Sequence, residues 1–194
     1  MTYSLLIASW VGYLGWHSIL ADTRVKAAAE KAMGRAYRFY RLGYSFISIA
    51  GLLGLMFMSG SIDAEYFFER QGVPRFFSFM LTTFGVMLIQ ISLRQHGLKA
   101  FLGFATERPG LHTLGLLSLI RHPIHAGVIL VTMGFFLFIP NLPTLVSCGC
   151  VLVYLPIGIF LEERKMVAAY GDAYRKYREE VPALIPRWSR LKRS

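Results

Sequence analysis

Residues 122–161 read HPIHAGVILVTMGFFLFIPNLPTLVSCGCVLVYLPIGIFL and contain no Asp, Glu, Lys or Arg. As one straight helix this stretch would be about 60 Å long at about 1.5 Å per residue, twice the roughly 30 Å of a bilayer's hydrocarbon core. It therefore has to fold back on itself. Pro140 and Pro143 mark the turn, because proline neither continues a helix nor donates a backbone hydrogen bond. The sequence predicts a hairpin of two membrane helices, 123–139 and 144–161.

Three further windows, residues 3–20, 42–62 and 76–93, also lack acidic and basic side chains. The first has no basic segment before its apolar core, so we expect a retained helix and not a signal peptide. The 194 residues are 55% hydrophobic and 16% charged, whereas soluble domains average about 25% charged residues. The sequence thus predicts an all-α integral membrane protein with five transmembrane helices, in a single domain covering residues 1–194.

The basic residues predict the orientation of these helices. Of the 21 Lys and Arg residues, 19 fall after the first, third or fifth span, and only Arg70 and Arg75 fall on the other side. By the positive-inside rule, the N-terminus lies outside and the C-terminus lies in the cytoplasm. The net charge of +10 then reflects topology and attraction to anionic lipid. The expected partner is the lipid bilayer and not nucleic acid, because no basic domain stands apart from the helices.

The segment after residue 161 is predicted to continue as an amphipathic cytoplasmic helix. Tyr170, Tyr174 and Tyr177 recur at i, i+4 and i+7 and would share one face. Such a stripe is more often a packing surface than a catalytic one, although its edge could line a pocket.

Charged residues bracket the hairpin at its cytoplasmic edge. Arg121 and His122 precede it, with Pro123 suited to the first turn of a helix, and Glu162 and Glu163 follow it. An exposed helix N-terminus attracts anions, and the hairpin brings this anion site close to the carboxylate pair. Each pair alone fits interfacial anchors or solvated helix-end charges. Together, so close to a bilayer, they favour a functional site.

His122 and His125 are spaced i, i+3, which is also compatible with a metal ion. A zinc site needs three or four protein ligands, and only His96, His112 or a glutamate remain to complete one. We therefore expect no metal. The chain also has no G-x-G-x-x-G loop and no H-E-x-x-H motif. A nucleotide-like cofactor would have to be bound by the hairpin and its flanks.

These elements together resemble the isoprenylcysteine carboxyl methyltransferase family, which groups with phospholipid N-methyltransferases. The family pattern is G-x-Y-x-x-x-R-H-P-x-Y-x-G, a helical hairpin, a Glu-Glu pair and G-x-x-Y-x-x-Y-x-x-x-V-P-x-x-x-P. The matching residues are Gly115, Arg121, His122, Pro123, Gly127, Glu162, Glu163, Gly171, Tyr174, Tyr177, Val181, Pro182 and Pro186. The resemblance covers residues 111–186, and the short loops favour a short, prokaryotic-type member. Leu117 and His125 stand where the family usually has tyrosine, which bears on the acceptor more than on the cofactor.

The resemblance implies S-adenosylmethionine as cofactor and, as methyl acceptor, the carboxylate of a lipid-tailed substrate such as a prenylated cysteine, entering laterally from the bilayer. The cofactor's ammonium and ribose hydroxyls suit Glu162 or Glu163, and its carboxylate suits His122 and Arg121. The expected catalytic residues are Arg121, which would orient the acceptor carboxylate, and Glu163. The expected cofactor-binding residues are His112, Leu114, Gly115, His122, Pro123, Gly127, Glu162, Glu163 and Tyr174.

Two other functions remain open on the sequence. A lipid-amine N-methyltransferase would use the same cofactor site, but its amine must lose a proton, so it needs a base such as His122, His125 or a glutamate. A non-enzymatic lipid-binding protein would account for the hydrophobicity and the basic loops. It leaves the glutamate pair opposite Arg121 and His122 unexplained.

Overall fold

The computed structural model describes residues 2–96 and 110–186, and the other positions of the single predicted domain lie outside this described part. The elements are α1 (Thr2–Ala21), α2 (Thr23–Met33), the 3-10 turn η1 (Gly34–Ala36), α3 (Tyr37–Gly60), α4 (Val73–His96), the 3-10 turn η2 (Gly115–Ser118), α6 (Pro123–Phe138) and α7 (Leu142–Glu180). Within the described residues, extended backbone pairs only at one isolated bridge, between Tyr66 and Asn141. The predicted all-α class is confirmed.

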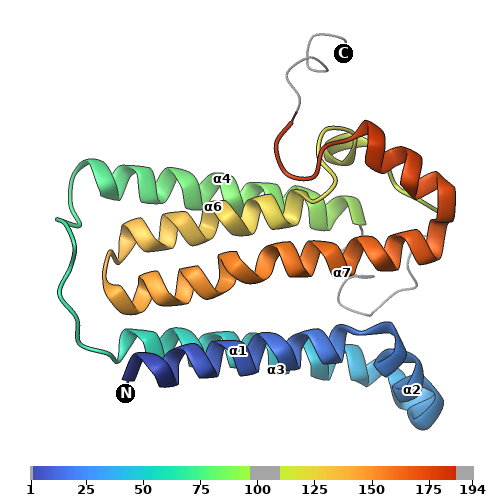
Figure 1. Cartoon of the computed structure of the whole chain (residues 1–194), viewed down its shortest axis with the longest axis horizontal. Coiled ribbons are helices and arrows are strands. Elements are labelled where there is room, and N and C mark those ends of the chain that lie inside the picture. Colours follow the sequence, from blue (N-terminus) through green and yellow to red (C-terminus); the bar gives the residue numbers. More distant parts are fainter. Residues whose placement is uncertain (1, 97–109, 187–194) are drawn as a thin grey trace.

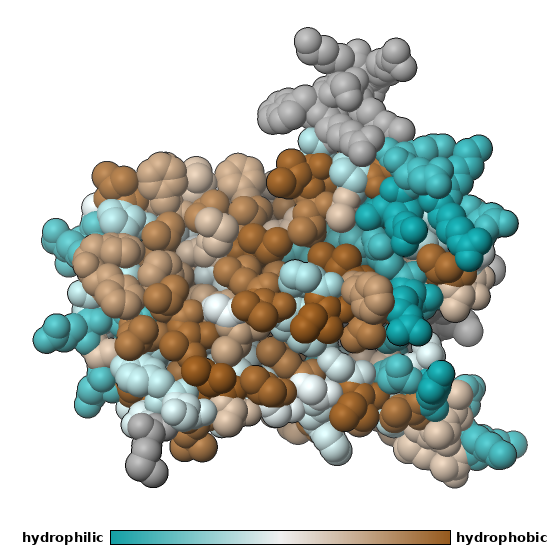
Figure 2. All heavy atoms as spheres, in the orientation of Figure 1, coloured by the Kyte–Doolittle hydropathy of each residue, from teal (hydrophilic) through white to brown (hydrophobic). Residues whose placement is uncertain are grey.

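Four of the described helices are long and apolar enough to cross a membrane: Thr2–Ala21, Leu42–Gly60, Val73–Gln95 and Leu142–Glu180. Figure 2 shows hydrophobic residues across the middle of the molecule and hydrophilic residues gathered at its two ends, as expected of a bundle in a bilayer. The apolar helix α6 has only 16 residues, or about 24 Å at about 1.5 Å per residue, which is less than a typical hydrocarbon core. The four long helices make the chain an integral membrane protein.

The helices lie in two layers on either side of α7, with α4 and α6 together on one side and α1 and α3 on the other (Figure 1). Glycines bring α4 and α6 close: a Cβ atom added to Gly127 would lie 2.6 Å from the carbonyl oxygen of Gly85. Further along, the Ser78 hydroxyl donates to the carbonyl of Gly134 at 2.8 Å. Small residues of this kind allow membrane helices to approach closely. The α4–α6 pair is therefore a rigid support for the start of α6.

On the other side of α7, an uncharged network joins α1, α3 and α7. We call it the neutral polar cluster; its residues are Tyr13, His17, Ser18, Tyr44, Ser48 and Tyr154. The hydroxyl of Tyr44 and Nε2 of His17 lie 3.1 Å apart, and the Tyr154 and Ser18 hydroxyls lie 2.5 Å apart. Because hydrogen bonds satisfy these groups inside the bundle, the cluster fixes how α1 and α3 sit against α7.

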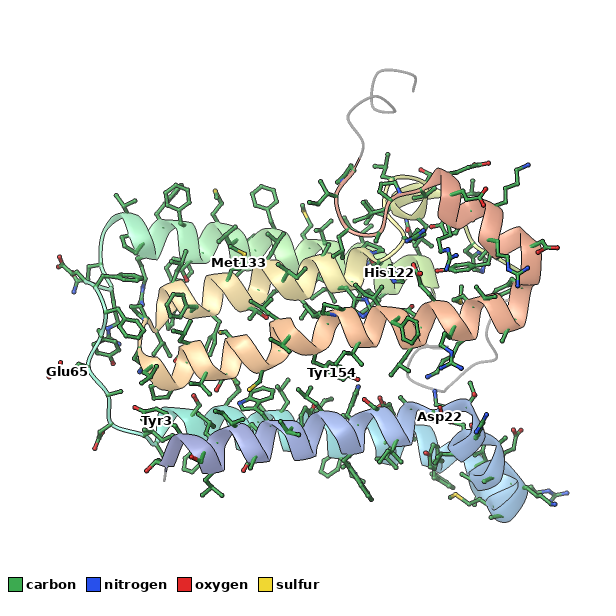
Figure 3. The ribbon with its side chains drawn as sticks, in the orientation of Figure 1. Tyr3, Asp22, Glu65, His122, Met133 and Tyr154 are labelled. Carbon is green, nitrogen blue, oxygen red and sulfur yellow. The ribbon has the colours of Figure 1, made fainter. Side chains whose placement is uncertain are left out.

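At one end of the bundle, the segment between α3 and α4 covers the connection between α6 and α7. The backbone N–H of Phe67 donates to the carbonyl of Pro140 at 2.8 Å. Asn141 caps α7, because its side-chain oxygen accepts from the N–H of Thr144 at 3.0 Å. Figure 3 shows Glu65 at this end and His122 toward the opposite end. The charged residues singled out by the sequence therefore lie far from this connection.

Helix α7 continues beyond the apolar stretch and then turns back over the end of the bundle (Figure 1). The turn occurs at Gly171, whose φ of 56° and ψ of −130° break the helical geometry. A positive φ is readily adopted by glycine and strained for residues with a Cβ atom. The part after the kink packs through Tyr174, Tyr177 and Val181, which are all buried. The helical continuation expected after residue 161 is present, with a bend that directs it onto the start of α6.

Candidate active site

The start of α6 is held by a segment that lies about sixty residues later in the chain. Pro123 occupies the first turn of α6, with His122 at the N-cap, as expected for a proline that lacks the N–H a helix leaves unpaired there. The backbone N–H groups of Arg121 and His122 donate to the carbonyls of Pro182 and Ala183 at 2.9 and 3.0 Å. These two bonds attach the chain after α7 to the entrance of α6. We call this attached segment, residues 181–186, the strap.

A carboxylate held by three basic side chains lies beneath the strap. The Oε1 atom of Glu163 is 2.8 Å from Nη2 of Arg121 and 3.1 Å from Nε2 of His122, and Arg178 Nη1 lies 3.8 Å from the second oxygen. The side chains of Arg121, His122 and Glu163 are 10%, 3% and 15% exposed. Such buried charges are tolerated only when paired. We call Arg121, His122, Glu163 and Arg178 the Glu163 cluster.

Glu162 lies in a different environment, with half of its side chain exposed. Its Oε2 atom is 3.3 Å from Nδ1 of His122 and 3.6 Å from Nδ1 of His125. The two imidazole rings are nearly perpendicular, with centroids 5.4 Å apart. Neighbouring glutamates on α7 thus have different surroundings, as expected because successive helical residues differ by about 100° in direction.

The carboxylates decide the protonation of His122. Burial by itself would lower the pKa of its imidazole, but the charges of Glu162 and Glu163, together with the hydrogen bond to Glu163, outweigh burial and raise the pKa above the ordinary histidine value. A protonated His122 adds a positive charge between the two glutamates. The start of α6 therefore gathers basic side chains and carboxylates inside a largely apolar bundle.

Three buried side-chain polar atoms have no hydrogen-bond partner within the described residues. Two belong to the Glu163 cluster, Nε of Arg121 and Nδ1 of His122, and the third is Oε1 of Gln95 on α4, beside Gly115. Glu162 lies near His122 Nδ1 but out of line for a hydrogen bond. Buried polar groups are nearly always satisfied in folded proteins, and an unsatisfied one calls for an explanation such as a catalytic role or a missing partner. The two unmet donors, Arg121 Nε and His122 Nδ1, together with the half-exposed carboxylate of Glu162, are suited to a polar ligand.

The tyrosines after the kink in α7 support the cluster. Tyr177 donates its hydroxyl to the carbonyl of Leu117 at 2.5 Å, and Tyr174 is only 2% exposed. Burial raises the pKa of both phenols to about 12, and for Tyr174 the charge of Glu163 contributes to the rise. Both tyrosines are therefore uncharged at neutral pH. They fix η2 and the end of α7 against each other.

The structure brings some of the predicted site residues together and leaves others apart. Arg121, His122, Glu162 and Glu163 form one constellation on the buried Pro123 turn, with Tyr174 packed behind it. Leu114 is 83% exposed and His112 is also exposed.

The two predicted glycines contact α4. A Cβ atom on Gly127 would meet Gly85 and Ile89, and one on Gly115, at a φ of 66°, would collide with the side-chain amide of Gln95. Their described contacts are thus made with α4 and not with the charged constellation. They shape the packing around the site.

Two residues of the constellation were missing from the predicted site set. Arg178 contacts Glu163 and offers its carbonyl to Nη1 of Arg121 at 2.6 Å. Its spacing of four residues from Tyr174 puts it on the same helical face, which could have revealed it. His125 lies beside Glu162, and its position three residues after His122 carried the same information.

His122, His125 and Glu162 each offer one ligand atom, and these atoms lie within 4.8 Å of one another. Three is the number of protein ligands in a catalytic zinc site and one fewer than the four of a closed structural site. The expectation that the chain binds no metal stays a prediction.

An all-helical membrane bundle with this charged constellation has the features of the isoprenylcysteine carboxyl methyltransferase-like family, and the comparisons with known proteins assign the chain to it. More specifically, residues 5–190 match the family model described as NnrU protein, so the chain belongs to the NnrU family.

Curated relatives include methanethiol S-methyltransferase 1 of Bradyrhizobium diazoefficiens, which is 35% identical over 89 residues, covering 42% of this chain and 28% of the relative. The methanethiol S-methyltransferase of a Pseudomonas strain is 28% identical over 120 residues, covering 58% of this chain and 43% of the relative. The methanethiol S-methyltransferase of Crocosphaera subtropica is 38% identical over 68 residues, covering 34% of this chain and 26% of the relative. The chain thus spans less than half the length of these relatives. No solved structure matches it significantly.

Proposed function

We propose that this protein is an S-adenosylmethionine-dependent methyltransferase with its site between Glu162, Glu163 and the start of α6. The observation that carries the proposal is the set of unmet buried atoms, Arg121 Nε and His122 Nδ1, beside a half-exposed carboxylate. The names of the relatives support the same type of reaction. The single domain 1–194 would hold its catalytic and cofactor-binding residues within 111–186.

In this proposal α6 also crosses the membrane, which makes five crossings in all, and it forms a hairpin with the first part of α7. Its 16 residues would cross with Ile139 and the flanking loop, a short span being accommodated by local thinning of the bilayer. The site, α2 and the amphipathic end of α7 would lie at the cytoplasmic face and the N-terminus outside. The support is the uneven distribution of the 21 basic residues and the positive-inside rule.

The polar groups fit the proposed cofactor. Glu162, half exposed, suits an ammonium or ribose hydroxyls and is better placed than Glu163, which Arg121 already engages. The unmet donors Arg121 Nε and His122 Nδ1 suit a carboxylate. His112, Leu114, Gly115, Pro123, Gly127 and Tyr174 complete the proposed binding residues. The bound cofactor supplies an electrophilic methyl group on a sulfonium.

The residues of the chain then act by positioning and by excluding water. Glu163 fixes the guanidinium of Arg121 and the ring of His122, so the donors around the site cannot drift apart. The strap and the buried tyrosines hold the start of α6 in place.

A thiol is the methyl acceptor we favour. Arg121, the group suited to orienting an acceptor carboxylate, is engaged by Glu163 at 2.8 Å and by the carbonyl of Arg178. The relatives are named for the S-methylation of a small thiol. The carboxylate of a lipid-tailed substrate such as a prenylated cysteine is the second candidate, and the bilayer-level position of the bundle favours its lateral entry.

The test is to purify the chain in detergent and measure two quantities separately: binding of S-adenosylmethionine by calorimetry, and transfer of its labelled methyl group. The acceptors are an alkanethiol, a farnesylated cysteine analogue and phosphatidylethanolamine. We expect binding together with label on the alkanethiol, and loss of both in Arg121→Ala. Glu65→Gln, at the other end of the bundle, is the matched control and should retain both.

Other outcomes would change the assignment. Base-labile label on the farnesylated analogue alone would replace the thiol by a carboxylate. Label on phosphatidylethanolamine alone would make the protein a lipid-amine N-methyltransferase. Absence of cofactor binding would overturn the proposal and favour a non-enzymatic lipid-binding protein.

A further inference from the structure

We propose that His125 is the group that takes the proton of the acceptor thiol, and that the thiol sits beside Gly158 between α6 and α7. The inference rests on the proposed methyltransferase function and adds the place and the chemistry of the acceptor. A neutral thiol is a poor nucleophile, and the thiolate is the reactive form. A simple alkanethiol is a weaker acid than the free cysteine thiol, whose pKa is about 8.5, so it needs a base at neutral pH.

The charge of Glu162 favours one tautomer of the His125 ring. Its Oε2 atom lies 3.6 Å from Nδ1 of His125, so the ring proton is favoured on Nδ1, facing the carboxylate. The lone pair is then on Nε2. A carboxylate that fixes the histidine tautomer in this way is a recurrent arrangement in general-base sites, and such contacts are often longer before the substrate binds.

Nε2 of His125 faces a part of α7 that has no side chain. A Cβ atom added to Gly158 would lie 3.6 Å from this Nε2 and 3.6 Å from Cε1 of Tyr154. Within the described residues, no protein group is hydrogen-bonded to Nε2, and the His125 side chain is 21% exposed. Only backbone thus borders the base at Gly158, and this is where the proposed thiol would approach Nε2.

The surroundings exclude the other histidine of the constellation. The His122 side chain is only 3% exposed and its Nε2 contacts Glu163 at 3.1 Å, so a substrate cannot reach that nitrogen. Among the described residues, the titratable groups facing the His125 ring are Glu162 and Tyr154 from α7 and His122 from its own helix. His122 is a cation when protonated, and the carboxylate of Glu162, which lies beside both rings, offsets its charge.

The identity of residue 125 also supports a base at this position. Where carboxyl methyltransferases have tyrosine, this chain has His125. A phenol with a pKa of about 10 keeps its proton at neutral pH and suits a carboxylate acceptor, which needs no base. An imidazole, whose ordinary pKa is about 6.5, accepts a proton there and suits an acceptor that must lose one.

The reaction balances without a further reactant. The thiol proton passes to Nε2 of His125, and the sulfur forms a bond to the methyl carbon as the bond from that carbon to the sulfonium breaks. A thioether and S-adenosylhomocysteine result. The proton leaves the imidazolium for solvent through the exposed edge of the ring.

The first test compares His125→Gln with the wild type on two acceptors, an alkanethiol and an aryl thiol that is already ionised at the assay pH. General-base catalysis is worth about 100-fold or more, so kcat/KM for the alkanethiol should fall by that factor and that for the aryl thiol should barely change. Equal losses on both acceptors would overturn the assignment of His125 as base. Binding of S-adenosylmethionine, measured by calorimetry, should persist, which separates this failure from failure of the proposed function.

The second test addresses the place of the thiol. Gly158→Ala puts a methyl group beside Nε2 at an ordinary contact distance, so the fold should tolerate it. Both thiols should lose on the order of 100-fold, because even a displacement of about 1 Å costs that much. Gly149→Ala, on the same helix, is the matched control, because a Cβ atom at Gly149 would meet nothing within 4 Å. Unchanged kinetics in Gly158→Ala would exclude this position.

A readout without turnover completes the design. Alkanethiol bound to the wild type in the absence of methyl donor should show ultraviolet thiolate absorbance at neutral pH, and bound to His125→Gln it should not. Equal thiolate absorbance in the two proteins would contradict the proposal.

Discussion

Two polar networks lie along the same helix, α7, and they differ in charge and in completeness. The neutral polar cluster around His17 and Tyr44 is uncharged, and its hydroxyl and imidazole groups pair with one another. The Glu163 cluster concentrates two arginines, a histidine and a carboxylate, and two of its members retain buried atoms without partners. Polarity in the first network serves helix packing. In the second it exceeds what packing requires, which is the physical sign of a binding site.

The largest difference between the two networks is expected when the carboxylate of Glu163 is removed. Glu163→Ala leaves Arg121 and His122 buried without their counter-charge, and breaking a buried pair from one side costs about 3–5 kcal/mol. We expect a large drop in the thermal denaturation midpoint in detergent and loss of cofactor binding. The control is Glu65→Ala in the exposed segment between α3 and α4, expected to stay within about 0.5 kcal/mol. A stable Glu163→Ala protein would show that the pair contributes little.

The next effect concerns the support of the cluster. Tyr177→Phe removes the hydroxyl that donates to the Leu117 carbonyl and leaves that buried oxygen unpaired, which costs about 1–3 kcal/mol. Chemical denaturation followed by tryptophan fluorescence measures the change. Tyr170→Phe, a partly buried neighbour in the same packing group, should cost less. Equal losses of stability in the two variants would show that the hydrogen bond from Tyr177 to Leu117 is not the cause.

A smaller effect is expected in the neutral polar cluster. Tyr44→Phe removes the hydroxyl contact with His17 and should reduce the stability of the bundle by about 0.5–1.5 kcal/mol, the usual net value of one hydrogen bond. Binding of S-adenosylmethionine should be unaffected because the cluster lies on the other side of α7. If Tyr44→Phe abolished cofactor binding, the division of labour between the two networks would be wrong.

The smallest expected effect is a dependence of stability on pH through His122. Its pKa is raised in the folded protein above the ordinary value of 6.5, by the two carboxylates acting against burial. The stabilisation is therefore complete below pH 6.5 and is lost as the pH rises through the folded-state pKa. Thermal midpoints measured across this window should fall with rising pH in the wild type. The slope should be flatter in His122→Gln.

The apolar runs were sufficient to predict most of the helical bundle, because a bilayer leaves the backbone little choice but helix. They were insufficient for α2, which is rich in charged residues and which hydropathy assigns to a loop. The local signals for α2 were nonetheless present. Asp22 caps it by accepting from the N–H of Arg24 at 2.8 Å, and alanines with high helix propensity follow.

The sequence predicted which residues meet in the constellation better than it predicted which side chains contact each other. Fold-back of the apolar stretch requires Arg121 and His122 to approach Glu162 and Glu163, and the structure has them in contact. The sequence does not tell which groups a long side chain contacts. Arg121, which was expected to orient an acceptor carboxylate, also binds Glu163. The contacts of Arg178 and the strap depend on the bend at Gly171, which helical periodicity does not reveal.

The attachment of the strap also has a consequence for the biosynthesis of the protein. Pro182 and Ala183 are made about 60 residues after Arg121, a delay of roughly 3–12 s at about 5–20 residues per second. During this interval the earlier membrane-spanning helices can enter the membrane while the backbone donors of Arg121 and His122 still lack their acceptors. Insertion and formation of the charged constellation are therefore separate events in time. A ribosome that stalls within the last part of α7 would leave an inserted protein without a completed site.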